Sequence, residues 1–274
     1  MSESIDELRE FSARHRRLWF LTGAGCSTGS GIPDYRDRDG QWKRKPPVTL
    51  QAFVGDVVTR QRYWARSLIG WPLFAQALPN EAHHALVRLQ QQGRVAALIT
   101  QNVDRLHQCA GSREVIDLHG RLDQVVCLNC KATEDRDTWQ LELIEANQTW
   151  SAQWRAHAVM APDGDADLND APFESFSVPA CRHCGGVLKP DVVFFGETVP
   201  RARVDAALLS LQTCDAVLIV GSSLMVYSGF RFARAASELG LPVVAISLGK
   251  TRADDLLEFR LQLDCSSALA ALSP

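Results

Sequence analysis

The sequence has no long apolar run and no strong excess of charge. None of its apolar stretches approaches the roughly 18 residues of a membrane-spanning helix. The first residues are acidic and lack the apolar core of a secretory signal and the arginines of a transit peptide, so we expect a cytoplasmic protein that binds no membrane. The net charge of −3 and the pI near 6.2 argue against a general nucleic-acid binder.

The composition is that of an ordinary globular protein. Of the 274 residues, 46% are hydrophobic and 22% are charged, which is enough apolar material for a real core. The length suits one large domain or two modest domains.

Cysteine occurs in a spacing that is typical of metal ligands. Four of the eight cysteines form two Cys-x-x-Cys pairs, Cys127/Cys130 and Cys181/Cys184. Four thiolates are the donor set of a closed tetrahedral zinc site, which leaves no position open for water. We therefore expect one structural zinc ion. The alternatives are four unligated core cysteines and a redox-active Cys-x-x-Cys pair.

A glycine-rich segment follows the apolar run at residues 18–21. Residues 23–31 contain four glycines, and a strand that leads into such a turn lets the backbone approach a phosphate. The segment is not the ordinary G-x-G-x-x-G fingerprint, because Thr28 stands where the third glycine belongs. The sequence therefore predicts a nucleotide that is bound in an unusual way.

Short apolar runs alternate with helical patterns along most of the chain. Strands are predicted at 18–22, 95–100, 115–118, 192–195, 216–220 and 243–247, and helices at 5–17, 81–92, 202–212 and 229–239. This alternation predicts an α/β fold with a doubly wound, mostly parallel, Rossmann-like sheet. Ligands of such sheets bind beyond the carboxyl ends of the strands, where polar residues gather in this sequence.

The middle of the chain interrupts the alternation. Residues 120–189 contain both cysteine pairs and a polar stretch with tryptophans, so we expect a small zinc-binding module inserted there. Residues 1–119 and 190–274 would form the Rossmann-like domain, with a helical segment at about 46–92. Breaks in that segment are predicted at Gly70, Pro72 and Pro79–Asn80.

A series of short motifs follows one order along the chain. They are Gly23-Ala-Gly-x-Ser27, Gly31-Ile-Pro-Asp-x-Arg36, Thr100-Gln-Asn-Val-Asp104, Leu118-His-Gly120, the two Cys-x-x-Cys pairs, Lys189-Pro-Asp-Val-Val-Phe-Phe-Gly-Glu197 and Gly221-Ser-Ser-Leu224. On these motifs the chain resembles a sirtuin, an NAD-dependent protein-lysine deacylase. The resemblance covers roughly residues 18–265.

Further segments resemble class II sirtuins, the group that contains the animal mitochondrial sirtuin 4. They are Pro33-Asp-Tyr35, Arg62-Tyr-Trp-Ala-Arg66, Ala161-Pro-Asp-Gly-Asp165, Val226-Tyr-Ser-Gly229 and Thr251-Arg-Ala-Asp-Asp255.

The resemblance implies NAD as co-substrate and one structural zinc ion. The residues that it implies for NAD are Gly23, Ala24, Gly25, Cys26, Asp34, Tyr35, Arg36, Gln101, Asn102, Asp104, Gly221, Ser222, Ser223, Ser247, Gly249 and Cys265. Asp34 and Asp104 could instead only cap local turns. Three positions depart from the family pattern. Tyr35 replaces a phenylalanine, which adds a hydroxyl near the nicotinamide pocket. Ser247 replaces an asparagine that contacts the adenosine ribose, and Cys26 replaces an aliphatic residue and is either redox-sensitive or a small buried thiol.

The resemblance also implies a catalytic role for His119 and Asn102. In the implied mechanism the acyl-lysine oxygen attacks C1′ of the nicotinamide ribose, and nicotinamide leaves. His119 then helps a ribose hydroxyl to attack, and the acyl group ends on ADP-ribose. An imidazole with a pKa near 6.5 suits this role as general base. The alternative for a histidine at a strand end is a structural role, which we expect for His107.

The implied substrate is an acyl-lysine protein or peptide in a cleft beside the zinc module. One edge of the cleft would be formed by Val193, Phe194, Phe195 and Gly196, and the other by residues 224–226. Phe194 and Phe195 could equally be core residues. Tyr63 and Arg66 share a helix face and match a pair that binds acidic acyl groups in some sirtuins, which predicts a preference for glutaryl-like groups. A solvated helix face is the alternative.

The sequence has to be weighed against several possible functions. NAD-dependent deacylation is the first hypothesis, and protein mono-ADP-ribosyl transfer is the alternative within the same fold. A non-catalytic NAD sensor is disfavoured by the intact His119 and Asn102, and a hydride-transferring dehydrogenase by Thr28. A DNA-binding zinc ribbon is disfavoured by the balance of charge.

Overall fold

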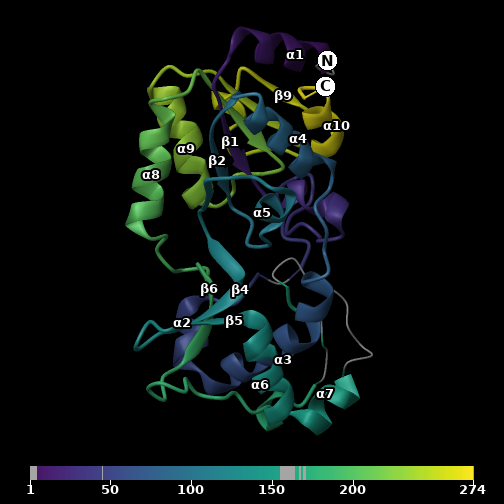
Figure 1. Cartoon of the computed structure of the whole chain (residues 1–274), viewed down its shortest axis with the longest axis vertical. Helices are drawn as coiled ribbons and strands as arrows, with labels where there is room; N and C mark the ends of the chain where they lie inside the picture. Colours follow the sequence, from purple (N-terminus) through teal and green to yellow (C-terminus); the bar gives the residue numbers. More distant parts are fainter. Residues whose placement is uncertain (1–4, 45, 155–163, 167, 169–170, 274) are drawn as a thin grey trace.

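The larger of two sheets consists of six parallel strands. They are β1 (Leu18–Thr22), β2 (Val95–Thr100), β3 (Val115–Asp117), β7 (Ala216–Val220), β8 (Val243–Ile246) and β9 (Phe259–Leu261), in the spatial order β3-β2-β1-β7-β8-β9 (Figure 1). The computed structural model describes residues 5–44, 46–154, 164–166, 168 and 171–273. Chain order reverses between β1 and β7, as in a doubly wound sheet. The predicted Rossmann-like α/β fold is therefore confirmed.

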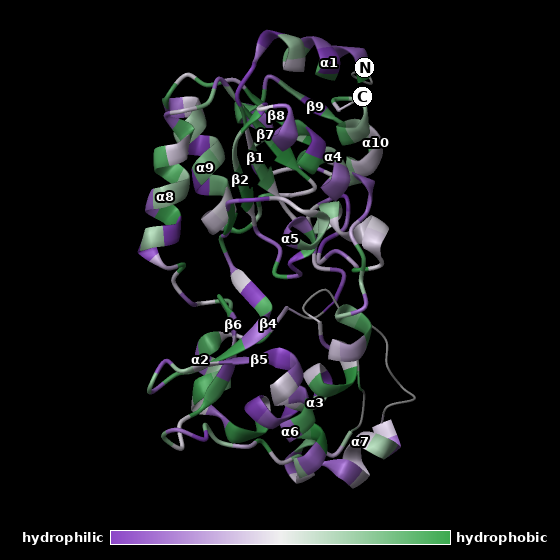
Figure 2. Ribbon diagram, viewed as in Figure 1, coloured by the Kyte–Doolittle hydropathy of each residue, from purple (hydrophilic) through white to green (hydrophobic). Residues whose placement is uncertain are grey.

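Strand side chains alternate between two apolar cores, one on each face of this sheet. Phe20 and Leu218 face the helices α1 (Ile5–Arg14), α4 (Glu81–Gln91) and α10 (Cys265–Ala270). Trp19 and Val217 face α8 (Arg201–Leu211) and α9 (Tyr227–Glu238). Every residue of β1 and β7 is buried, and Figure 2 shows these central strands as hydrophobic. Burial on both faces explains why the strands are apolar runs without polar alternation.

A second, smaller lobe lies below the large sheet in Figure 1. Its antiparallel sheet has the order β5-β4-β6, with β4 (Gly120–Cys127), β5 (Thr133–Asp135) and β6 (Leu188–Val192). It packs with the helices α2 (Leu50–Gly55), α3 (Val57–Phe74), α6 (Arg136–Ala146) and α7 (Gln148–Trp154). Trp64 and Trp139 are fully buried in this core, with ring centroids 5.3 Å apart.

The helical segment predicted at 46–92 divides between the two lobes. α2 and α3 belong to the core of the small lobe, whereas α4 packs on the large sheet. The predicted domain boundary after residue 189 falls inside β6. The division of the chain into domains stays a prediction.

Two predictions of secondary structure were wrong. No strand runs over 192–195: β6 ends at Val192 and belongs to the small sheet. Proline is unusual within a strand because it donates no ladder hydrogen bond. Pro190 is tolerated in β6, since β6 pairs with β4 alone and is an edge strand. The predicted break at Gly70 and Pro72 is also absent, because α3 continues to Phe74.

Tertiary packing explains the continuous α3. A Cβ atom on Gly70 would lie 2.4 Å from the carbonyl carbon of Asp165 and from the carbonyl oxygen of Gly164. The glycine is therefore required by a close backbone approach and does not mark a helix end. The helices α6, α7 and α10 and the strands β4, β5 and β9 were not predicted. Among the described residues, no helix is both long and apolar enough to cross a bilayer.

Candidate functional site

A cavity of about 920 Å³ lies beyond the carboxyl ends of the parallel strands. It is lined by the segments that follow β1, β2, β3, β7 and β8. Of the residues predicted to bind NAD, all but Cys26 line it, namely Gly23, Ala24, Gly25, Asp34, Tyr35, Arg36, Gln101, Asn102, Asp104, Gly221, Ser222, Ser223, Ser247, Gly249 and Cys265. The topology therefore brings together residues that are up to 242 positions apart in the sequence (23 to 265).

The loops after β1 and β7 pack backbone to backbone at the point where strand order reverses. The amide of Gly25 donates to the carbonyl of Gly221 at 2.8 Å. A Cβ atom on Gly25 would lie 2.9 Å from the Cα atom of Gly221, so no larger residue fits. Two short 3-10 turns, η1 (Ala24–Cys26) and η2 (Thr28–Ser30), follow. Among the described residues, the amides of Gly23 and Gly25 donate to the carbonyls of Val220 and Gly221, whereas the amide of Ala24 has no acceptor, so it is the amide of this turn that a phosphate could use.

A polar cluster joins the glycine-rich loop to the loop after β2. The side-chain amide of Asn102 donates to the carbonyl of Gly23 and to Ser27 Oγ, both at 3.0 Å. Ser27 Oγ donates to Asp104 Oδ2 at 2.6 Å. Burial raises the pKa of Asp104, and the bond from Ser27 acts in the opposite direction. Asp104 also accepts from the amide of Leu106 at 2.9 Å, so it caps the local turn and lines the cavity at once.

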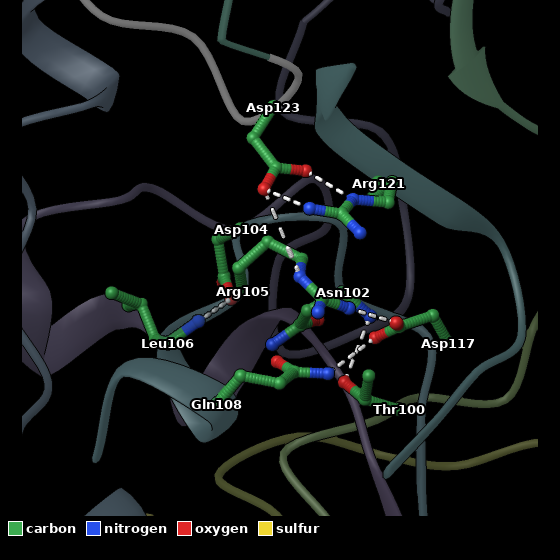
Figure 3. A network of polar contacts seen from close by, with 9 residues as sticks. All are labelled: Thr100, Asn102, Asp104, Arg105, Leu106, Gln108, Asp117, Arg121 and Asp123. Carbon is green, nitrogen blue, oxygen red and sulfur yellow. Dashed lines mark hydrogen bonds and ion pairs between the residues drawn. The ribbon is translucent and has the colours of Figure 1, made fainter. Parts of the chain in front are cut away.

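Charged residues beneath this cluster connect the two lobes, as Figure 3 shows. Arg105, in the left-handed backbone region with φ 64°, pairs with Asp117 of β3. It also lies 3.9 Å from Asp123 of β4, which Arg121 contacts in turn. The Asp104–Leu106 turn is thereby held between the large sheet and the small sheet.

His119 follows β3 and faces the cavity. Its Nδ1 atom lies 3.0 Å from the carbonyl oxygen of Gln101, and its Nε2 atom 2.8 Å from Ser228 Oγ. Because a carbonyl oxygen only accepts, Nδ1 carries the hydrogen and Nε2 accepts from the Ser228 hydroxyl. Burial lowers the pKa of His119 to about 4, and the charges of Arg203 and Arg231 act in the same direction. The imidazole is therefore neutral near pH 7, and its one basic lone pair is the Nε2 lone pair that accepts from Ser228.

The segment from Asp34 to Lys43 forms one wall of the cavity. Asp34 pairs with Lys43, and the guanidinium of Arg36 donates to the carbonyl of Gly40 at 2.7 Å. Arg36 also lies 3.8 Å from the centroid of the Trp42 ring, and Trp42 contacts Phe195 at 5.5 Å between ring centroids. These contacts tie the loop to the opposite, small-lobe side of the cavity.

The residues predicted for the acyl-lysine substrate divide into two groups. Val193, Phe194, Phe195, Gly196 and Tyr63 line the cavity. Arg66 is not among the lining residues, and its Nε atom donates to the carbonyl of Ala166 at 2.8 Å. Part of the class II-like segment 161–165, residues 161–163, lies outside the described residues.

Cys26 and His107 are buried behind the cavity. Cys26 is 1% exposed, and burial and the neighbouring Cys265 thiol raise its pKa. His107 lies 2.9 Å from Thr22 Oγ1 through Nε2, which fits the structural role expected of it.

Several polar residues of the cavity were not assigned a role from the sequence, among them Ser27, Ser228 and Arg231. Ser27 lies inside the first motif but was not named as a contact, whereas Ser228 and Arg231 lie in the first turns of α9. Ser228 belongs to the class II-like segment Val226-Tyr-Ser-Gly229, and the sequence signal for Arg231 was its position shortly after the polar end of β7.

The four cysteines Cys127, Cys130, Cys181 and Cys184 come together in the small lobe. Their sulfur atoms all lie within 4.8 Å of one another, with 3.5 Å from Cys127 to Cys184 and 3.8 Å from Cys130 to Cys181. Four sulfurs bound tetrahedrally to zinc at about 2.3 Å are about 3.8 Å apart, so the set fits one zinc ion with no open position. Backbone amides of Cys130 and Asn129 lower the pKa of Cys127 to about 6, which favours the thiolate that a metal binds.

Comparison with known proteins gives a consistent result. The model of the Sir2 family matches residues 23–228. A protein named "NAD-dependent protein deacetylase" from Xanthomonas axonopodis pv. citri (strain 306) is 60% identical over 265 residues, which cover 97% of this chain and 89% of that protein. A protein of the same name from Bordetella pertussis is 58% identical over 270 residues, covering 98% and 97%.

Solved structures agree with this relationship. A Sir2 variant with a deacetylated p53 peptide and 3′-O-acetyl ADP-ribose has a TM-score of 0.79 and 29% identity, over 98% of this chain and 97% of that one. Sir2Tm bound to a propionylated peptide has a TM-score of 0.75 and 28% identity, over 98% and 96%. On the matched motifs, the fold and these relatives, the chain belongs to the Sir2 family, the sirtuins.

Proposed function

We propose that this protein is an NAD-dependent protein-lysine deacetylase that uses His119 as its general base. The observation that carries the proposal is the state of this histidine. Its Nδ1–H is held by the carbonyl of Gln101, its pKa is lowered to about 4, and it lies in the same cavity as the glycine-rich loop. Close relatives that carry the name of a deacetylase support the same function.

Each group of residues would have a role that follows from its position in the cavity. The glycine-rich turn at Gly23–Gly25, with the amide of Ala24 as its free donor, would hold the pyrophosphate, and Asn102 and Asp104 would hold the nicotinamide end. NAD, when bound, supplies a glycosidic bond to nicotinamide whose cleavage exposes a ribose carbon to the acyl oxygen. Nε2 of His119 then accepts the proton of a ribose hydroxyl. The four cysteines would hold a zinc ion that stabilises the small lobe and takes no part in the chemistry.

The acyl preference is a separate part of the proposal. An acidic preference requires Tyr63 and Arg66 to face one pocket, but only Tyr63 lines the cavity. Tyr63 packs among aromatic rings, with centroids 5.4 Å from Phe53 and 5.3 Å from Phe194. This apolar setting favours a small apolar acyl group over an anionic one, so we expect acetyl-lysine to react faster than glutaryl-lysine.

The test is NAD-dependent release of nicotinamide across acetyl, propionyl, succinyl and glutaryl peptides, with product masses recorded. From the acetyl peptide, the expected products are O-acetyl-ADP-ribose and the deacetylated peptide, and His119→Tyr should abolish both. Mass added to a protein target, without deacylation, would favour the alternative of ADP-ribosyl transfer. Faster turnover of glutaryl peptides that is lost in Arg66→Ala would restore the acidic preference.

Three finer expectations remain part of the proposal. They are the class II likeness, the acyl-lysine protein or peptide as partner, and the cytoplasmic location. Cell fractionation tests the cytoplasmic location, and the relative turnover of the four acyl peptides tests the class II likeness.

A further inference from the structure

Two arginines flank an exposed tyrosine at the rim of the cavity. Tyr227 begins α9, lines the cavity and is 44% exposed. The guanidinium carbon of Arg231 lies 5.1 Å from the centroid of its ring, and that of Arg252 lies 5.9 Å away. Arg252 is further attached to the loop after β7, because its NH1 atom donates to the carbonyl of Met225 at 3.3 Å. Arg231 lines the cavity near residues 224–226, the predicted substrate edge, whereas Arg252 is not a lining residue and reaches that edge through Met225 and the ring of Tyr227.

The positive charge of this pair is not neutralised by the protein. Within the part of the chain that the structure describes, neither Arg231 nor Arg252 forms an ion pair, and the buried Nε atom of Arg231 has no hydrogen-bond partner. Arg234, on the same ring at 5.8 Å, differs because it pairs with Glu238 at 3.3 Å. Because the Nε atom is buried, an incoming carboxylate could meet only the terminal nitrogens of the Arg231 guanidinium, whose charge no acid of the described residues neutralises.

The opposite edge of the cleft offers no competing acid. Glu197 lines the cavity, but it accepts from Lys189 Nζ at 3.1 Å and from the amide of Phe194 at 2.9 Å. Glu197 is thereby satisfied within its own lobe, and Asp37, another acid of the lining, accepts from the backbone amides of Asp39 and Gln41. The charge of Arg231 reaches as far as His119, whose pKa it helps to lower.

We propose that Arg231 and Arg252 select acyl-lysines that are flanked in sequence by aspartate or glutamate. A substrate backbone along residues 224–226, with its acyl-lysine directed toward His119, carries a neighbouring side chain past Tyr227. A carboxylate there accepts hydrogen bonds from the guanidinium groups, whose planar donors match carboxylate geometry. The inference rests on the proposed function and names the substrate class of the same site.

The experiment uses acetyl-lysine peptides of equal length, with Glu, Ala or Lys at the two positions on each side of the acetyl-lysine. For the wild-type protein we expect kcat/KM to be about tenfold higher for Glu than for Ala peptides, mostly through KM, and lowest for Lys peptides. Arg252→Gln and Arg231→Gln should reduce the ratio of Glu to Ala peptides toward one. Arg252→Glu should invert the preference toward Lys peptides. The matched control is Arg234→Gln, which removes a charge from the same ring and should keep the wild-type ratio.

The outcomes separate this inference from the proposed function. Equal turnover of Glu and Ala peptides by the wild-type protein, or a ratio that all three variants at Arg231 and Arg252 leave unchanged, overturns the inference but keeps the deacetylase. Turnover of no peptide overturns the proposed function instead. Direct binding of the fluorescently labelled peptides then decides the inference, since equal affinity of Glu and Ala peptides would refute it.

Discussion

Nε2 of His119 lies 2.8 Å from Oγ of Ser228, a residue of the first turn of α9. The hydroxyl contacts the nitrogen that the proposed chemistry needs as a base. Since Gln101 already fixes the tautomer through Nδ1, Ser228 fixes the orientation of the ring from its other side. The loop after β2 and the helix α9 thus meet at one imidazole.

This contact predicts a loss of rate when the hydroxyl is removed. Ser228→Ala should lower kcat for formation of O-acetyl-ADP-ribose by about tenfold, because a bond to an ionisable ring is worth about 1.5 kcal/mol. The KM for NAD should change little, and Ser228→Thr should keep most of the rate. A rate in Ser228→Ala equal to wild type, or a loss confined to KM, contradicts the positioning role.

The lowered pKa of His119 predicts activity at mildly acidic pH. With the pKa near 4, in contrast to the ordinary value of about 6.5, the imidazole stays neutral and able to accept a proton well below pH 6. We expect kcat/KM to be flat from pH 8 to about pH 6 and to fall only toward pH 5 and below. An acidic limb centred near 6.5, in protein shown by circular dichroism to be folded, would contradict the burial argument.

Two other histidines predict acid sensitivity of the fold itself. His83 and His107 are buried with ring centroids 4.8 Å apart, and burial lowers their pKa values to about 4 and about 3. The unfolded chain titrates near pH 6.5, so below that pH it binds more protons than the folded protein. Stability should therefore be fully present above about pH 6.5 and decline as the pH falls toward 4.

Urea unfolding at pH 7.5, 6 and 5 measures this decline. A difference of one pKa unit corresponds to about 1.4 kcal/mol, so the two histidines together account for several kcal/mol over the full range. His107→Gln should flatten the dependence on pH. The control is the exposed His84, and His84→Gln should keep the wild-type slope. Parallel slopes in His107→Gln and wild type would exclude this origin of acid sensitivity.

The cysteine cluster predicts a dependence of the small lobe on zinc. The purified protein should contain one zinc ion per chain, and a chelator or Cys181→Ser should lower the melting temperature by many degrees, because binding at such sites is worth on the order of 10 kcal/mol. Cys109→Ser changes an exposed cysteine outside the cluster and should leave zinc content and melting temperature unchanged. A full complement of zinc in Cys181→Ser would contradict the assignment.

The sequence was informative where local chemistry is decisive. Apolar runs such as Ala216–Val220 can be recognised as strands in the sequence because both faces of the sheet are covered. The Cys-x-x-Cys spacing indicates the four metal-binding thiolates without any tertiary information. Local signals failed at Gly70 and at residues 192–195. Glycine is ordinarily a helix breaker, but Gly70 permits a close approach of backbone, and the apolar run 192–195 begins only where β6 ends.

Motif order in the sequence alone thus determined the family and the cysteine set, because both depend on residue type and spacing. The tertiary structure decided which side chains reach the cavity. It separated Tyr63 from Arg66, although the two share a helix face, and it placed Ser228 against His119 and Arg231 beside Tyr227. These relations depend on how α3 and α9 pack against segments far away in the chain. Local sequence patterns determine the type of an element but not its distance from such segments.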